Sequence, residues 1–254
     1  MNAPATAAAM APISTLPVRF SHLKAYGRSA AHGLHARTVE SEPTYAMERG
    51  TVVHALLFGN RKVAGYPGAQ RRGKEFDAFV AAHPDTEILT SAEFDKARRM
   101  ADAVRASELA MSVLAGVQEK TILFRWMGLD CRATPDVRGP NYLTELKCSA
   151  SSDPVRFPWQ ALRMMYHAQM RFQKIACKEA IDDCFVVCVE DKEPHPVTVF
   201  RIEDRALEVG ERLLMLWAER LKNSEASRQW PPYVTCVVPI DVQDEETELI
   251  FGDE

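Results

Sequence analysis

Two carboxylates and a lysine stand close together in an otherwise apolar stretch, residues 131–148, which reads CRATPDVRGPNYLTELKC. Asp136 follows a proline, Glu145 comes nine positions later, and Lys147 lies two residues beyond it. If the two acids occupy adjacent strands, they lie side by side at the end of a sheet, where like charges repel unless a cation or a proton separates them. Carboxylate oxygens favour Mg²⁺ or Mn²⁺. The sequence therefore predicts a site for a divalent metal ion.

The alternation of side chains along a strand places Lys147 at this same site. Residues two apart point to one face, so Glu145 and Lys147 share a face while Leu146 points into the core. The lysine can then orient or activate a water molecule, or neutralise a phosphate, and the Leu146 carbonyl is free to act as a further ligand. A simple ion pair between the lysine and a carboxylate at a sheet edge explains the isolated pattern equally well.

The surrounding pattern predicts helices first and then a mainly antiparallel sheet interrupted by a long helix. Apolar periodicity and capping residues predict helices over 20–36, 45–60, 91–115, 156–180 and 204–222. Alternating apolar residues and turns predict strands over 120–126, 129–137, 142–148, 182–190 and 196–203. Glycine and arginine predict an irregular loop over 61–76, and prolines indicate an edge segment over 230–242. This order is typical of an α/β (α+β) sandwich.

Size and composition are those of one soluble enzyme domain. The 254 residues are 46% hydrophobic and 26% charged, and they predict a flexible leader over 1–17 and a single domain over 18–254. A net charge of −4 argues against a general nucleic-acid coat protein but allows a basic groove. The six cysteines include no CxxC pair, which favours reduced thiols over an iron–sulfur cluster. No apolar run is long enough for a membrane span, and we expect a cytoplasmic protein.

Several segments, in their order along the chain, resemble one family. They are FSHLKAYGRSAAHG, RGTVVHALLFG, RRGKEF, QEKTILFRWMGLDCRATPDV, LTELKCSAS, YHAQMRFQ and WPPY. Proline–aspartate, eight residues and then Glu-Leu-Lys resembles the core of the PD-(D/E)XK nuclease superfamily. The whole set is similar to the RecE-like (exonuclease VIII-type) exonucleases of phages and prophages. The resemblance covers most of the chain after the leader and implies a PD-(D/E)XK nuclease core, with a central mixed β-sheet flanked by helices.

The resemblance also implies roles for individual residues of this chain. It implies metal ligands at His54, Asp136 and Glu145, with the Leu146 carbonyl as another, and it makes Lys147 the catalytic lysine. A lone helix histidine is more often a satisfied structural residue, but this one ends a GxxxH spacing upstream of the acidic motif. The implied cofactor is Mg²⁺ or Mn²⁺.

Three further positions match the family pattern less closely. Glu119 stands where these proteins often carry a glutamate, although a surface charge on the first strand explains it equally well. Gln169 matches the glutamine of the family's Q-x3-Y motif. A simpler interpretation of Gln169 is an exposed glutamine on a helix. Gln173 stands in place of the motif's tyrosine, which leaves the tyrosine's DNA-strand contact in question but not the metal chemistry.

Basic side chains in two regions are candidates for contact with the phosphates of DNA. The first region is a loop, for which a solvated surface is the simpler interpretation. The second region is the helix that carries Gln169. The candidates are Arg71, Arg72 and Lys74, with Arg61 and Lys62 before them, and Arg163 and Arg171 on the helix.

The expected function is metal-dependent hydrolysis of DNA from duplex ends. By resemblance, digestion runs from the five-prime end and leaves single strands for a single-strand annealing recombinase, and the enzyme is a ring-shaped homo-oligomer. One alternative is another nuclease of the superfamily, either an endonuclease or a CRISPR-adaptation nuclease with an iron–sulfur cluster. The other is a catalytically silent module that binds DNA or a recombinase. An intact Asp136, Glu145 and Lys147 favours the enzyme.

Overall fold

The computed structural model describes residues 16–40, 42–178, 181–234 and 236–238. Most of the predicted leader lies outside the described residues. Part of the predicted edge segment over 230–242 also lies outside them, and its described part forms no strand. None of the helices that the structure describes is both long enough and apolar enough to span a membrane.

Helices make up the larger share of the regular structure. They are α1 (Phe20–Arg28), α2 (Ala30–Thr38), α3 (Tyr45–Phe58), α4 (Lys74–Ala82), α5 (Ser91–Ala106), α6 (Glu108–Val113), α7 (Phe157–Arg163), α8 (Tyr166–Cys177) and α9 (Asp204–Ser227). The strands are β1 (Lys62–Tyr66), β2 (Thr86–Thr90), β3 (Val117–Gln118), β4 (Ile122–Trp126), β5 (Leu129–Ala133), β6 (Val137–Arg138), β7 (Tyr142–Ser149), β8 (Asp183–Glu190) and β9 (Val197–Arg201).

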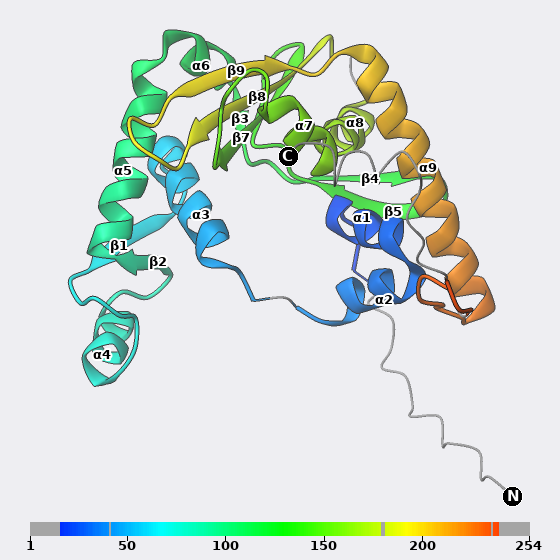
Figure 1. Ribbon diagram of the computed structural model, residues 1–254, viewed down its shortest axis with the longest axis horizontal. Helices are drawn as coiled ribbons and strands as arrows, with labels where there is room; N and C mark the ends of the chain where they lie inside the picture. The colour runs from blue at the N-terminus through cyan, green and yellow to red at the C-terminus, as the bar shows by residue number, and fades with distance from the viewer. Residues whose placement is uncertain (1–15, 41, 179–180, 235, 239–254) are drawn as a thin grey trace, which may run out of the picture.

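A five-stranded sheet in the order β3-β6-β7-β8-β9 forms the centre of the molecule (Figure 1). β7 and β8 pair in parallel over eight residues because α7 and α8 form the crossover between them, and the other neighbouring strands are antiparallel. Leu146, Val187 and Val189 bury one face of the sheet in a core shared with α3 and α5. This mixed sheet flanked by helices confirms the predicted α/β fold class.

The prediction of a single strand over 129–137 is wrong, because this segment forms two strands, β5 and β6. β5 pairs with β4 in a separate hairpin, whereas β6 joins the central sheet between β3 and β7. Pro135 lies at the break, and a proline cannot donate a hydrogen bond to a sheet ladder. The break places Asp136 directly before β6, at the end of the central sheet.

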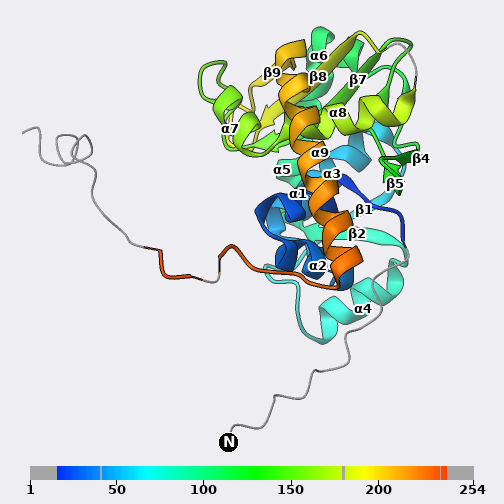
Figure 2. The ribbon, with the colours of Figure 1, turned by 90° about the vertical axis from the view of Figure 1, so that its right-hand side faces the viewer.

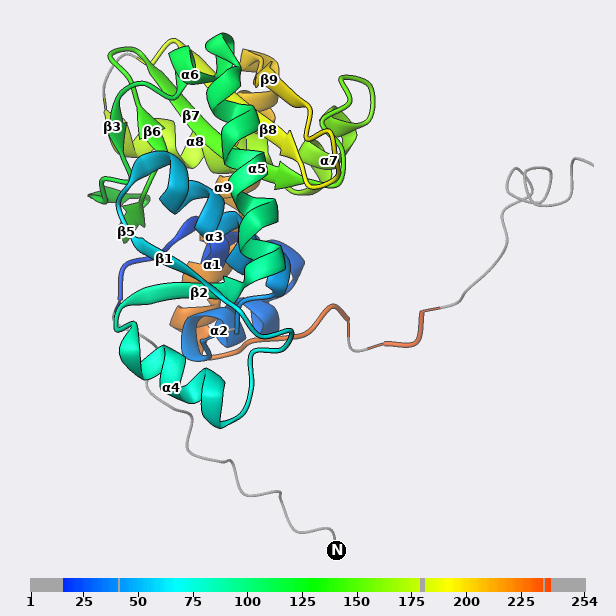
Figure 3. The ribbon, with the colours of Figure 1, turned by 90° about the vertical axis from the view of Figure 1, so that its left-hand side faces the viewer.

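The irregular loop predicted over 61–76 is also wrong in part. β1 lies within it and pairs in parallel with β2, a strand that the sequence pattern did not reveal, and α4 begins at Lys74. Tyr66 at the end of β1 packs edge-on against Phe76 and Phe79 of α4. Figure 3 shows β1, β2 and α4 together in one arm below the central sheet.

Three predicted long helices are each two helices. Ser29 separates α1 from α2 and caps the second by accepting a hydrogen bond from the His32 backbone, and Ser107 does the same for α6. Met165, with a positive φ of 63°, separates α7 from α8. The apolar periodicity runs on through Ser29 and Ser107, so it predicts one long helix in each case. Their side chains bond to the backbone and end the first helix there.

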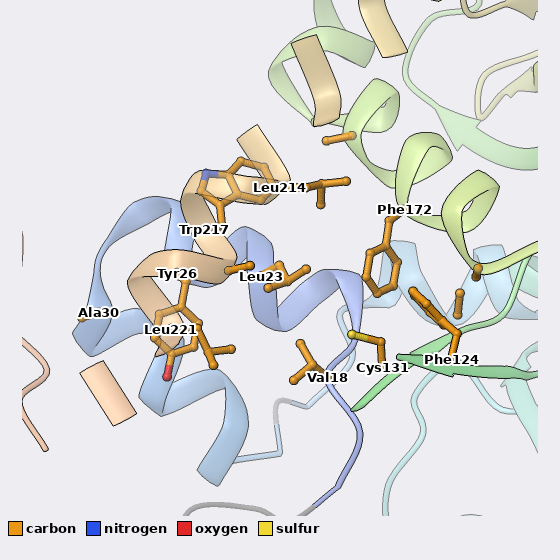
Figure 4. Packing of buried hydrophobic residues seen from close by; sticks show 14 residues of the cluster. Val18, Leu23, Tyr26, Ala30, Phe124, Cys131, Phe172, Leu214, Trp217 and Leu221 are labelled. Atoms are coloured by element: carbon orange, nitrogen blue, oxygen red, sulfur yellow. The ribbon is translucent and has the colours of Figure 1, made fainter. Parts of the chain in front are cut away.

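A second core joins the first helix to the last (Figure 4). Leu23 and Tyr26 of α1 face Trp217 and Leu221 of α9, and Figure 2 shows α9 running from the sheet down to α2. A Cβ atom at Gly27 would lie 2.6 Å from the Trp217 ring, so this close approach needs glycine. The core fixes α1 beside α8 and the β4–β5 hairpin.

Candidate active site

Neighbouring backbone segments bring the predicted acidic residues together at one end of the central sheet. Asp136 precedes β6, and in the β6–β7 register Val137 lies opposite Thr144, next to Glu145. The backbone N–H of Glu119, just after β3, donates to the Asp136 carbonyl at 3.0 Å. Three adjacent strands therefore contribute carboxylates to one place.

Among the residues that the structure describes, one group of three side chains is close enough to hold a metal ion: His54, Glu119 and Asp136, whose ligand atoms all lie within 4.8 Å of one another. His54 Nδ1 lies 3.5 Å from Glu119 Oε1 and 3.8 Å from Asp136 Oδ1, and its Nε2 lies 3.1 Å from the Leu146 carbonyl. An imidazole and two carboxylates beside a backbone carbonyl suit Mn²⁺ or Mg²⁺. The residues present therefore fit a divalent ion.

The pKa values of this group reflect burial and the repulsion between neighbouring carboxylates. Burial and the charge of Glu145 raise the pKa of Asp136 to about 7. Burial lowers the pKa of His54, but Asp136 and Glu119 outweigh it and raise that pKa above its ordinary value. The hydrogen bond with His54 lowers the pKa of Glu119. A proton on His54 or Asp136 relieves the repulsion that a metal ion would otherwise neutralise.

Glu145 is buried and lies outside the group of His54, Glu119 and Asp136. Three side chains donate hydrogen bonds to its carboxylate. Its Oε2 accepts from Lys147 Nζ at 2.5 Å and from Gln169 Nε2 at 2.8 Å, and its Oε1 accepts from Gln173 Nε2 at 2.5 Å. Its charge is nevertheless felt at Asp136, whose pKa it raises. Its role as a direct ligand stays a prediction, whereas Glu119, whose role the sequence left open, lies within the group.

Lys147 stays positively charged in this environment. Burial lowers its pKa, but Glu145 and Asp136 outweigh burial and raise the pKa above the ordinary range of a lysine. Its Nζ also lies 5.2 Å from the centre of the Tyr166 ring, a favourable cation–π contact. A lysine held in this way acts as a fixed positive charge, so orienting water and neutralising phosphate suit it better than accepting a proton.

A cavity of about 320 Å³ opens beside the candidate ligands. His54, Glu119 and Lys147 contribute to its lining, together with Arg61. The Arg61 guanidinium is half exposed and is shared between two carboxylates, Glu87 at 3.3 Å and Glu119 at 3.9 Å.

A basic groove of about 480 Å³ is lined in part by Gln169 and Gln173, whose side chains contact Glu145. The sequence analysis missed its three basic residues, Arg19, Lys24 and Arg132, and among the described residues none that lines it is acidic. Two hydrogen bonds between the Val18 backbone and β5 bring the start of α1 next to Arg132. No local signal predicts so distant a pairing.

The predicted DNA-contact residues fall into two sets. Arg71 is already engaged, because it pairs with Glu48 at 2.5 Å, donates to the Ile88 carbonyl and lies over the Tyr45 ring. Arg171 likewise donates to Glu211 at 2.8 Å. Arg61 is paired with Glu87 at 3.3 Å. The other exposed residues remain candidates: Lys62, Arg72, Lys74 and Arg163.

Gln169, which was predicted to contact DNA, and Gln173, whose role was left open, both lie beside Glu145. Gln169 is half-buried and Gln173 is buried, and both donate to Glu145. Gln169 is therefore not an exposed helix glutamine. Its amide and that of Gln173 extend from α8 to Glu145 in the central sheet. Only the spacing of four residues, which places both on one helix face, could have indicated this from the sequence.

Comparison with known proteins agrees with this geometry. A solved structure of a candidate exonuclease from Eubacterium rectale is similar over 93% of this chain and 94% of its own, with 16% identity and a TM-score of 0.62. At that identity the likeness shows the fold. A phage-related exonuclease from Haemophilus somnus 129PT matches at 12% identity over 84% of this chain and 97% of its own, with a TM-score of 0.42. No curated protein matches the chain.

The family assignment comes from the sequence itself. Residues 19–237 match the family described as a PDDEXK-like domain of unknown function (DUF3799). This range contains every candidate ligand and confirms the predicted resemblance to PD-(D/E)XK phage exonucleases at the level of the superfamily. With the sheet, the carboxylates and the lysine arranged as described, the chain belongs to this family of PDDEXK-like domains.

Proposed function

We propose that this protein is a divalent-metal-dependent DNA exonuclease. The observation that carries the proposal is the group of His54, Glu119 and Asp136 at the end of a PD-(D/E)XK sheet, with the cationic Lys147 and the buried Glu145 beside it. A lone ion pair at a sheet edge would not need an imidazole and a second carboxylate at the same place.

In the proposed reaction, each residue has a distinct task. A bound Mg²⁺ or Mn²⁺ would polarise the phosphoryl oxygen and lower the pKa of a water molecule. His54, Glu119 and Asp136 would hold the ion, and Lys147 keeps its charge beside the phosphate, where negative charge develops as water attacks phosphorus. The bond from phosphorus to the leaving oxygen breaks, and a proton from the attacking water ends on that oxygen.

The substrate we propose is a duplex DNA end. The basic groove supports this choice, because Arg19, Lys24 and Arg132 give the backbone of one strand a path to Glu145 and Lys147. Digestion from the five-prime end, delivery of single strands to an annealing recombinase and a homo-oligomeric assembly follow from the resemblance to RecE-like exonucleases. They are parts of the same proposal.

End-dependent cleavage is the first expected result. With Mg²⁺ or Mn²⁺, linear duplex DNA should be degraded while covalently closed circles of the same sequence survive, and EDTA should stop the reaction. Duplexes blocked at the five-prime or the three-prime end then report the direction. Equal loss of linear and closed DNA would identify an endonuclease instead.

The groove gives a second expected result. Replacing Lys24 and Arg132 by alanine should weaken binding to all DNA sequences alike and reduce the slope of log affinity against log salt by roughly one unit per lost phosphate contact. Filter binding in EDTA at several salt concentrations measures the slope without cleavage. Arg98→Ala with Arg125→Ala is the matched control, since it removes two exposed charges outside the groove. Identical slopes for both double variants would remove the groove from the proposal.

A further inference from the structure

Gln173 is a buried polar side chain with one conspicuous contact. Only 3% of its surface is exposed, and its Nε2 donates to Glu145 Oε1 at 2.5 Å. Its own Oε1 has no hydrogen-bond partner among the described residues. The amide is therefore oriented by Glu145 alone, because an ionised carboxylate accepts hydrogen bonds and cannot donate them.

Glu145 depends on this contact as much as the glutamine does. The carboxylate is 2% exposed, and Lys147 and Gln169 both donate to its Oε2, which leaves Gln173 as the recorded donor to Oε1. A buried carboxylate oxygen without a donor is costly, so loss of the amide would favour another rotamer of Glu145 or entry of water.

The geometry of α8 makes the two glutamines a pair. Positions 169 and 173 are four residues apart and lie on one face of the helix, so their amides reach the two oxygens of the same carboxylate. A tyrosine at position 173 would bring one hydroxyl on a rigid ring in place of this amide. The contact of one amide with each oxygen of Glu145 therefore depends on a glutamine at position 173.

We propose that Gln173 is a positioning residue that fixes the Glu145 carboxylate for the metal site. It acts on the metal site through its contact with Glu145. Partners that orient a ligand-forming carboxylate typically contribute about 10–100-fold to metal affinity or activity. The inference rests on the metal site of the proposed function, but it concerns metal binding and can be measured without DNA.

The experiment compares Gln173→Met with a matched control, Thr144→Val. Methionine keeps the length and approximate volume of glutamine and removes the donor. Thr144 precedes Glu145 on β7, is fully buried, and donates to the Val113 carbonyl at 2.6 Å, so its replacement removes a buried hydrogen bond that does not face the carboxylate. Mn²⁺ affinity is measured by calorimetry, and folding is checked by thermal melting in EDTA. Gln173→Leu serves if the methionine variant does not fold.

The expected result is a 10–100-fold weaker Mn²⁺ affinity for Gln173→Met and an unchanged affinity for Thr144→Val, even where both lower the melting temperature. In cleavage assays, the reduction in the rate of Gln173→Met should shrink as the metal concentration rises, because more metal fills a site of weakened affinity. Wild-type affinity in Gln173→Met would overturn the inference while leaving the nuclease proposal intact. Wild-type protein that binds Mn²⁺ but cleaves no DNA would overturn the proposed function alone, and wild-type protein that binds no Mn²⁺ would overturn both.

Discussion

Asp136→Asn and Lys147→Ala are each expected to reduce DNA cleavage by at least several hundredfold. Asp136 lies in the candidate metal group, and Lys147 is the fixed cation beside it. A bound metal ion contributes several kcal/mol to stabilising the transition state, and each 1.4 kcal/mol corresponds to about a tenfold change in rate. Single-turnover degradation of end-labelled linear duplex at saturating Mg²⁺ measures the loss.

Two comparisons make this result specific. Lys222→Ala, which removes an exposed lysine from α9, should cleave at the wild-type rate. Far-UV circular dichroism should show that the inactive variants are folded. Near-normal turnover in Lys147→Ala would mean that the lysine is an ion-pair partner of Glu145 and has no part in the chemistry.

Thermal stability gives the second large effect, without any DNA. In EDTA at pH 8, Asp136→Asn should melt at a higher temperature than the wild type, because burial and Glu145 make a charged Asp136 unfavourable in the folded state. An acid whose folded pKa is raised to about 7 destabilises the fold fully above that pH. The penalty fades as the pH falls towards the ordinary pKa of an aspartate, so the two melts should converge at about pH 4.

Metal should narrow the difference between these two melts. Binding to the folded state stabilises the wild type by RT ln(1 + [L]/Kd), about 2.7 kcal/mol at a hundredfold excess over Kd, and the asparagine variant should lose most of this gain. Melting curves in EDTA and in Mg²⁺ for both proteins measure it. If Asp136→Asn is neutral or destabilising in EDTA and Mg²⁺ shifts neither curve, the acidic pair is structural and the site holds no metal.

The part of the site that the sequence predicts is the part that is local in the chain. Asp136, Glu145 and Lys147 lie on neighbouring strands joined by a short turn, so alternation and spacing suffice to place them near one another. His54 comes from a distant helix, and only its resemblance to a family pattern singled it out. Glu119 reaches the same group through the pairing of β3 with β6, which the sequence indicates weakly because β3 has two residues.

What the sequence did not predict depends on long-range packing. Arg19 and Arg132 meet in the groove because Val18 pairs with β5, and no periodicity encodes that pairing. β1 and β2 pair in parallel across an intervening helix, and β1 contains the small residues Ala64 and Gly65, which give little strand signal. The role of Gln173 stayed open in the sequence, because burial of a polar side chain is visible only once its partner is in place.

The bridge between Val18 and β5 joins segments that lie far apart in the sequence. The strands that carry the acidic residues and Lys147 pair with close neighbours in sequence, so they form at little cost in chain entropy. The groove forms only when the start of α1 docks on the β4–β5 hairpin, together with the core that α1 shares with α9. Closing so long a loop costs more chain entropy than pairing neighbouring strands, so we expect this contact to open more readily than the β6–β7 pairing. A partly opened molecule would thus keep the pairing of the strands that carry its acidic residues and lose the groove, so the groove and the acidic group can differ in local stability.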